Sequence, residues 1–143
     1  MAQTIREVMT RDVEVIGPQD TLRDAAEKMR SLNVGALPVC AGERVVGMIT
    51  DRDIVVRAIA LGMDSASTSV EDAMTGNVQF CFEDDDAMGV LARMRDMQVR
   101  RIIVVNEEER LVGIVSLGDL SQTISERRVG EALEGISEPT PSV

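Results

Sequence analysis

The chain repeats itself, and this internal duplication constrains its fold more strongly than any other feature of the sequence. The run Val8-Met9-Thr10 returns as Ala73-Met74-Thr75, an offset of 65 residues. At the same offset an apolar stripe with helical spacing recurs, and all of its positions stay apolar. The stripe comprises Leu22, Ala25, Ala26, Met29 and Leu32 in the first copy, and Ala87, Val90, Leu91, Met94 and Met97 in the second. Two similar folding units in tandem are therefore predicted.

Each copy carries the signals of a strand, a helix, two further strands and a second helix. In the first copy the β-like run 13–16 precedes Thr21 and Asp24, which match a capping box at a helix start. Short apolar runs follow at residues 36–40 and 45–49, and a second helical pattern begins after them. The predicted fold class is α/β (α+β), built from tandem β-α-β-β-α repeats.

The predicted domain boundaries follow from these repeats. Residues 1–63 form the first repeat with its N-terminal lead-in, and the small polar stretch 64–70 is predicted to be a linker. Residues 71–126 form the second repeat. The remainder, 127–143, ends in a run that is poor in apolar residues, so we expect this tail to be partly disordered.

Composition excludes several classes of function. The formal net charge of −10 disfavours nucleic acid and anionic lipid surfaces, and no apolar run approaches the ~18 residues needed to span a bilayer. The chain has no His, which removes imidazole catalysis and His-ligated metal. Cys40 and Cys81 have no metal-ligand spacing and are interpreted as buried hydrophobic residues rather than a disulfide. We expect a cytoplasmic protein that is not an enzyme.

One motif stands at the same place in both copies, where a strand passes into a helix. Residues 47–53 and 113–119 both run Gly, two apolar residues, Thr or Ser, two variable residues and Asp. On the local pattern alone, the hydroxyl and the carboxylate three positions later form a helix cap. The same groups also suit a nucleoside, because a helix N-terminus can hold phosphate and a carboxylate can accept both hydroxyls of a ribose. The leading Gly would leave room for a base or sugar beside the backbone.

Together these motifs resemble a pair of CBS domains, the regulatory modules named after cystathionine beta-synthase. The resemblance rests on the Met-Thr lead-ins, the run Gly35-Ala36-Leu37-Pro38-Val39-Cys40 and the two junctions, and it covers about residues 5–125. The sequence is especially similar to small stand-alone two-CBS proteins of bacteria. The resemblance implies two repeats packed about a pseudo-two-fold axis, with two clefts that in relatives bind AMP, ADP, ATP, NAD or S-adenosylmethionine.

The resemblance also implies which residues would line each cleft. The first cleft would combine Thr50 and Asp53 with Val78, Phe80, Arg100, Arg101 and Ile102. The second would combine Ser116 and Asp119 with Val13, Val15, Gly35, Ala36, Leu37 and Pro38. Asp53 would hold a ribose and an arginine a phosphate, and the sequence leaves open which of the two consecutive arginines faces the cleft. Arg52 and Arg57 are weaker candidates for phosphate contact. Because Gly35 and Ala36 stand where the second repeat has arginines, we predict unequal sites, with the first the better.

Two functions from different classes remain. The leading hypothesis is a non-catalytic sensor with an adenine nucleotide as its regulatory ligand and no other cofactor, acting on an unidentified effector. The alternative is a homodimerisation or interaction module whose junctions are only caps. Its candidate apolar faces, for which a core position is favoured, are Ile54, Ile59, Leu61, Leu117, Leu120 and Ile124. The acidic run 83–86 is interpreted as a helix start rather than a metal site.

Overall fold

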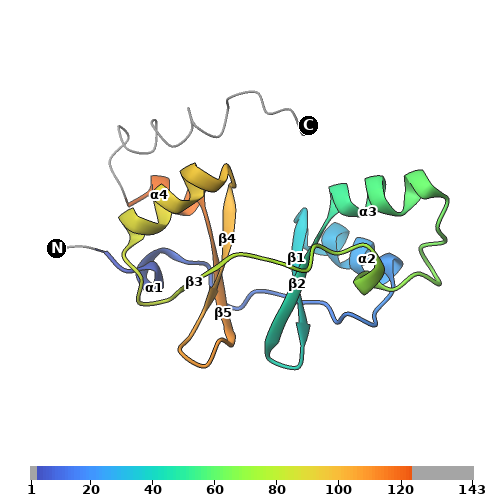
Figure 1. Ribbon diagram of the computed structural model, residues 1–143, viewed down its shortest axis with the longest axis horizontal. Helices are drawn as coiled ribbons and strands as arrows, with labels where there is room; N and C mark the ends of the chain where they lie inside the picture. The colour runs from blue at the N-terminus through green and yellow to red at the C-terminus, as the bar shows by residue number, and fades with distance from the viewer. Residues whose placement is uncertain (1–2, 124–143) are drawn as a thin grey trace. The chain divides into compact units, whose positions relative to one another are not determined.

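Two compact units make up the chain in the computed structural model, which describes residues 3–123 (Figure 1). The first-repeat unit comprises residues 14–78, and the described part of the second-repeat unit joins residues 3–13 to residues 79–123. Both units mix helices and strands, which confirms the predicted α+β class. Among the described residues, no helix is long and apolar enough to cross a membrane.

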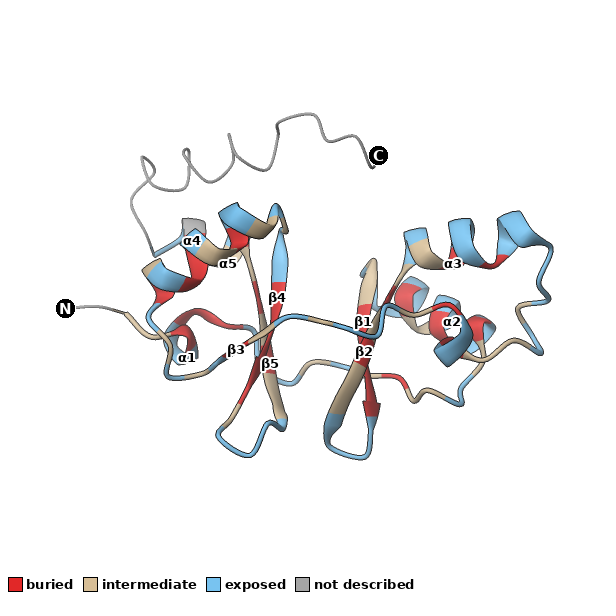
Figure 2. Ribbon diagram, in the orientation of Figure 1, coloured by how far each residue is buried: buried red, intermediate tan, exposed pale blue. Residues whose placement is uncertain are grey.

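The first-repeat unit packs a two-stranded hairpin against helices. β1 (Ala36–Ala41) and β2 (Arg44–Thr50) pair antiparallel, after α2 (Leu22–Leu32) and directly before α3 (Asp51–Arg57). Two short 3-10 helices, η1 (Ile59–Leu61) and η2 (Val70–Asp72), complete the unit. Its core comprises Ile16, Leu22, Ala25, Met29, Leu37, Val39, Ile49, Ile54, Ala58, Val70 and Ala73. The core therefore draws on both helices, both strands and the segment after α3 (Figure 2).

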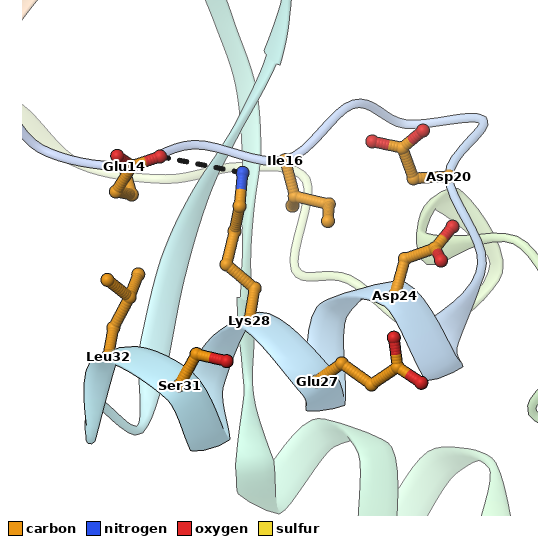
Figure 3. A pocket seen from close by; sticks show the side chains of 8 residues that line it. All are labelled: Glu14, Ile16, Asp20, Asp24, Glu27, Lys28, Ser31 and Leu32. Atoms are coloured by element: carbon orange, nitrogen blue, oxygen red, sulfur yellow. Dashed lines mark ion pairs between the residues drawn. The ribbon is translucent and has the colours of Figure 1, made fainter.

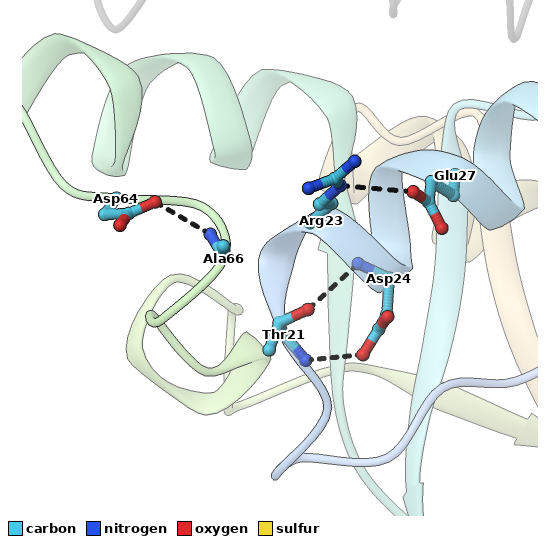
Figure 4. A network of polar contacts seen from close by, with 6 residues as sticks. All are labelled: Thr21, Arg23, Asp24, Glu27, Asp64 and Ala66. Atoms are coloured by element: carbon cyan, nitrogen blue, oxygen red, sulfur yellow. Dashed lines mark hydrogen bonds and ion pairs between the residues drawn. The ribbon is translucent and has the colours of Figure 1, made fainter.

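The start of α2 shows how local sequence sets a helix boundary. Thr21 Oγ1 accepts from Asp24 N (3.1 Å) and Asp24 Oδ2 accepts from Thr21 N (3.1 Å), so the predicted capping box is present (Figure 4). The carbonyls of Ser65 and Thr68 accept from the next free N–H groups of the helix, those of Arg23 and Leu22. The chain itself therefore satisfies this helix terminus, which leaves it unsuited to an external anion.

The second-repeat unit has the same plan with a third strand. β3 (Phe80–Phe82) runs parallel to β4 (Arg101–Val105), and β4 pairs antiparallel with β5 (Leu111–Ser116). α1 (Ile5–Val8), α4 (Ala87–Met97) and α5 (Leu117–Ser121) supply the helices. Its core comprises Ile5, Val8, Met9, Cys81, Ala87, Val90, Leu91, Met94, Ile102, Val104, Val115, Leu117 and Leu120.

The Met-Thr segments are exchanged between the sequence repeats. Thr75, at the start of the second repeat, forms an antiparallel bridge to Met48 of β2, while Thr10 of the first forms one to Ile114 of β5. The lead-in therefore packs with the second repeat, and residues 64–70 pack on the N-terminus of α2 instead of standing apart as a linker. The predicted boundaries describe the sequence repeats, whereas the compact units follow this exchange.

Several finer predictions agree with the structure only in part. Both predicted stripes form one-sided helices, yet Ala26 is exposed and Leu32 is 42% exposed, so the first stripe is narrower than predicted. The β-like run 13–16 makes only a single parallel bridge, from Ile16 to Val39. The acidic run does start a helix, because Asp86 caps α4 by accepting from Gly89 N (3.1 Å). The predicted disordered tail, 127–143, and Ile124 lie outside the described residues.

Candidate functional site

The first junction is a complete capping box. Thr50 ends β2 in an extended conformation, and its Oγ1 accepts from Asp53 N (3.0 Å) while Asp53 Oδ2 accepts from Thr50 N (3.0 Å). The second oxygen of the carboxylate, Oδ1, lies 3.8 Å from Arg57 Nε one helical turn later. The Asp53 side chain is only 14% exposed. The carboxylate is therefore shielded and satisfied within its own unit.

The second junction repeats the cap without the arginine. Ser116 Oγ accepts from Asp119 N (3.1 Å), and Asp119 Oδ2 accepts from Ser116 N (2.9 Å). The residue one turn after Asp119 is Thr123, whose hydroxyl donates to Leu120 O (3.3 Å). Within residues 3–123 no Lys or Arg nitrogen lies within ion-pair distance of the Asp119 carboxylate. Asp119 is half-buried, and its Oδ2 is the oxygen that takes part in the cap.

The two glycines of the motif serve packing rather than ligand access. A Cβ on Gly47 would lie 2.7 Å from the carbonyl oxygen of Thr75, and one on Gly113 would lie 2.7 Å from that of Thr10. Both distances are shorter than real Cβ contacts. The exchanged Met-Thr segments occupy the space that we assigned to a base or sugar, so that expectation was wrong.

The strand register places one of the two arginines beside the second junction within its own unit. Arg101, the first residue of β4, is the direct antiparallel partner of Ser116, just as Ala36 is the partner of Thr50. Directly opposed residues point to the same face of a sheet with their Cβ atoms ~5 Å apart. The buried pair Ile102 and Val115 belongs to the core of the unit, so Arg101 and Ser116 occupy the opposite face.

Arg100 has a different role from its neighbour. Its carbonyl accepts from Leu117 N (3.0 Å) and so closes the strand-to-helix corner. Both arginines are exposed, and neither side chain makes a hydrogen bond or ion pair within residues 3–123. The sequence grouped the arginines with Thr50 and Asp53. The register brings Arg101 beside Ser116 within one unit, and the grouping with Thr50 and Asp53 across the repeats stays a prediction.

The other predicted lining residues fall into three groups. Leu37 and Ile102 are buried in the two cores, so their side chains point away from any ligand. Gly35 contributes its carbonyl, which accepts from Asp51 N (2.9 Å), and Pro38 contributes its own to Ile16 N (3.1 Å). The remaining residues are half-buried and accessible: Val13, Val15, Ala36, Val78 and Phe80.

A pair of basic residues that the sequence did not single out supports these segments. Lys28 Nζ, on α2, donates to Val15 O (2.7 Å), and Arg93 Nη2, on α4, donates to Phe80 O (3.0 Å). Donor and acceptor are both related by the 65-residue offset of the repeat. The signal that could have revealed them is a basic residue at matching helix positions. Each cation ties its helix to the segment that carries predicted ligand contacts.

The sequence profile of the CBS domain matches this chain twice, at residues 5–59 and 70–126. The chain belongs to the CBS domain family. Among curated relatives, hypoxic response protein 1 of Mycobacterium tuberculosis is 34% identical over 137 residues, which cover 95% of both chains. The uncharacterized protein YlbB of Bacillus subtilis is 43% identical over 139 residues, covering 94% of this chain and 91% of that protein.

Solved structures of CBS proteins agree with the fold. The crystal structure of hypoxic response protein I with two coordinated zinc ions matches with a TM-score of 0.78 and 35% identity, covering 86% of this chain and all of that one. The CBS domain pair of protein MJ0100 matches with a TM-score of 0.72 and 25% identity, covering 85% and 95%. That pair was crystallised in complex with 5′-methylthioadenosine and S-adenosyl-L-methionine. The predicted resemblance to CBS pairs is confirmed.

No residues of this CBS pair are arranged to hold a metal within the described part of the chain. No group of three or more Cys, Asp or Glu side chains converges there. Cys40 and Cys81 are free and buried, as predicted. Burial raises the pKa of the Cys40 thiol, and burial together with the Asp85 carboxylate raises the pKa of Cys81 to about 12. Both sulfurs are therefore protonated at neutral pH and poor ligands or nucleophiles.

An open pocket of about 500 Å³ lies beside α2 (Figure 3). Its lining is acidic and comprises Glu14, Ile16, Asp20, Asp24, Glu27, Lys28, Ser31 and Leu32. The charged groups already have partners: Asp20 accepts from Gly17 N (2.8 Å), Glu27 pairs with Arg23 (3.2 Å) and Lys28 lies 3.6 Å from Glu14. These carboxylates are structural, and the junctions remain the stronger candidates for a ligand.

Proposed function

We propose that this CBS pair is a non-catalytic regulatory module that binds an adenosine-containing nucleotide and signals by a change in conformation or association. The complex of the MJ0100 pair with two adenosine derivatives supports this ligand class. The candidates are AMP, ADP, ATP, NAD and S-adenosylmethionine. A cytoplasmic location, where these compounds are available, and action on a separate effector protein are parts of the proposal.

The observation that carries the proposal is the pairing of Arg101 with Ser116. It brings together, on one unit, a half-buried carboxylate, a helix start and a guanidinium without a protein partner in residues 3–123. Asp119 would accept hydrogen bonds from the ribose hydroxyls, and Arg101 would contact a phosphate or carboxylate of the ligand. We therefore propose the Ser116 junction as the principal nucleotide site. This proposal assigns Arg101 to the second junction, whereas the sequence grouped it with Thr50.

The cap and the site use different atoms, so they are compatible. Asp119 Oδ2 and the Ser116 hydroxyl hold the first turn of α5, while Asp119 Oδ1 is left for the ligand. Binding would then bring an anionic group to a helix start and neutralise Arg101 without breaking the helix. Leu117 and Leu120 of α5 are buried in the core, so a shift of this helix on binding would reach the rest of the unit.

Titration calorimetry with the five candidate ligands tests the proposal. We expect at least one to bind, and Asp119→Ala and Arg101→Ala each to weaken binding by about tenfold or more, the cost of a charge-assisted hydrogen bond. Asp119→Asn controls for loss of volume, and Arg100→Ala for loss of a neighbouring charge. If no ligand binds, or if Asp119→Ala binds like the parent, the proposed site is wrong.

The alternative role, homodimerisation, is favoured by a separate observation. The segment 55–63 on α3 and η1 exposes apolar side chains, with Ile59 61% and Leu61 72% exposed. At the 66-residue offset of this part of the repeat, their sequence counterparts are Ser125 and Arg127. Ile54, Leu117 and Leu120 are core residues, as the sequence favoured, whereas the core position favoured for Ile59 and Leu61 was wrong because both are exposed. We propose that two copies pair through the exposed α3–η1 face, and that dimerisation accompanies ligand binding rather than replacing it.

A further inference from the structure

The two CBS junctions differ in what occupies the second oxygen of the carboxylate. In the first junction Asp53 Oδ1 faces Arg57 Nε at 3.8 Å. The same guanidinium donates through Nη1 to the carbonyl of Met74 (3.2 Å), in the exchanged Met-Thr segment. Arg57 is thus held at two points, and one of them is the oxygen that a ribose would use.

The second junction has no such group at the corresponding place. Arg57 corresponds to Thr123 at the 66-residue offset, and that hydroxyl is directed to the carbonyl of Leu120 instead. The two caps are otherwise alike, with matching donors, acceptors and bond lengths between 2.9 and 3.1 Å. The arginine is therefore a specific addition to the first repeat.

We propose that Arg57 is an internal counter-ion that competes with ligand at Asp53 and makes the first junction the weaker nucleotide site. A ribose offers neutral hydroxyl donors, whereas the guanidinium places a positive charge 3.8 Å from the same oxygen as an ion pair. A ligand must displace it before its hydroxyls can reach the same oxygen. This inference rests on the proposed nucleotide function and identifies Arg57 as a specificity-determining residue for it.

The i, i+4 spacing of Asp53 and Arg57 on α3 brings the two competing groups together within one helical turn. Asp53 and Arg57 are one turn apart on α3, where side chains four residues apart lie on the same face. The shielding of Asp53 strengthens the pair relative to a fully exposed one, while the half-exposed arginine keeps it weak enough to be displaced. The affinity of the first junction for ligand is thus lowered, and the site is not abolished.

Calorimetry with AMP on the full chain tests the role of Arg57. The parent should bind one AMP tightly, through Asp119, with a second site that is weak or undetected. Arg57→Thr, which installs the residue of the second repeat, should raise affinity at the first junction by about two- to fivefold, the range of a half-exposed ion pair. The double variant Arg57→Thr/Asp53→Ala should lose this gain. Arg44→Thr, which removes an equal charge from an exposed position of the same unit, should change nothing.

The outcomes separate this inference from the function on which it rests. If Arg57→Thr weakens or leaves unchanged the binding at the first junction, Arg57 is not a competitor, and a loss would make it a ligand contact. Two equal sites in the parent would also overturn the inference while supporting the function. If AMP binds only to the Arg57→Thr variant, Arg57 does compete with ligand for Asp53, but the Ser116 junction is not the principal site. No binding by either protein overturns both, provided that circular dichroism shows both to be folded.

Discussion

Gly47 and Gly113 lie against the backbone of the exchanged Met-Thr segments. Since the carbonyl of Thr75 would be 2.7 Å from a Cβ on Gly47, we expect Gly47→Ala to destabilise the protein by about 1–3 kcal/mol through overpacking. Gly76→Ala is the matched control, because its Cβ would meet nothing within 4 Å. Urea denaturation measures both. Equal stability of the two variants would show that the segment moves aside without cost.

Cys81 links stability to alkaline pH. Its thiol has a pKa of about 12 in the fold and about 8.5 in an unfolded chain, so the folded state keeps the proton to higher pH. The contribution of this thiol to the free energy of unfolding is complete below about pH 8.5 and declines as the pH rises toward 12. The chain has no Tyr and a single Lys, so few other groups titrate in this range.

Denaturation midpoints between pH 7 and 11 measure this effect. We expect the parent to lose stability above about pH 8.5 more steeply than Cys81→Ala, which removes the thiol. A reagent that reacts with thiolates should also label Cys81 only after unfolding. Parallel pH profiles for the two proteins would contradict the assignment.

At the residue scale the sequence predicts what is local and misses what depends on pairing. The capping boxes at Thr21, Thr50 and Ser116 were predictable because each involves groups three residues apart. The partner of Arg101 was not, because strand register depends on the hairpin turn and on the bulge between Val104 and Val105. The Asp53–Arg57 pair was visible as an i, i+4 spacing, but nothing local indicated that the guanidinium also reaches Met74.

At the scale of elements, the two basic tethers join helix to strand in each unit. Arg93 holds α4 to the carbonyl of Phe80, and we expect Arg93→Met to cost about 1–2 kcal/mol by leaving that carbonyl without its charged donor. Amide hydrogen exchange in β3 should accelerate in parallel. Arg93→Lys should restore most of the loss, since Lys28 performs this task in the first unit. Arg95→Met, at an exposed position of the same helix, is the control; equal losses in both variants would contradict the tether.

Element order was predictable from the sequence, whereas element partnership was not. The period of the apolar residues predicted α2 and α4 with their stripes, and the repeated Gly-to-Asp junctions predicted where β2 and β5 end. The exchange of the Met-Thr segments was hidden, because Thr10 and Thr75 occupy equivalent positions and each could pair with either repeat. Identical local patterns cannot distinguish pairing within a repeat from pairing between repeats.

At the scale of the whole molecule, the α3–η1 face predicts self-association. Leu61→Asp places a charge on a residue that is 72% exposed, so we expect the variant to fold and to shift a dimer toward monomer in light scattering. Leu32→Asp is the control, since this leucine is 42% exposed on α2 in the same unit. A parent that is monomeric at high concentration, or a dimer unaffected by Leu61→Asp, would contradict the proposed face.

We predict that an adenosine nucleotide binds first at the junction of Ser116 and Asp119, beside Arg101. Two-dimensional amide NMR of the labelled chain during titration with AMP measures this directly. We predict that the amides of residues 116–120 and of Arg101 shift at the lowest concentrations, and that those of residues 50–54 shift later. Shifts that begin at residues 50–54, or none at either junction, would contradict it.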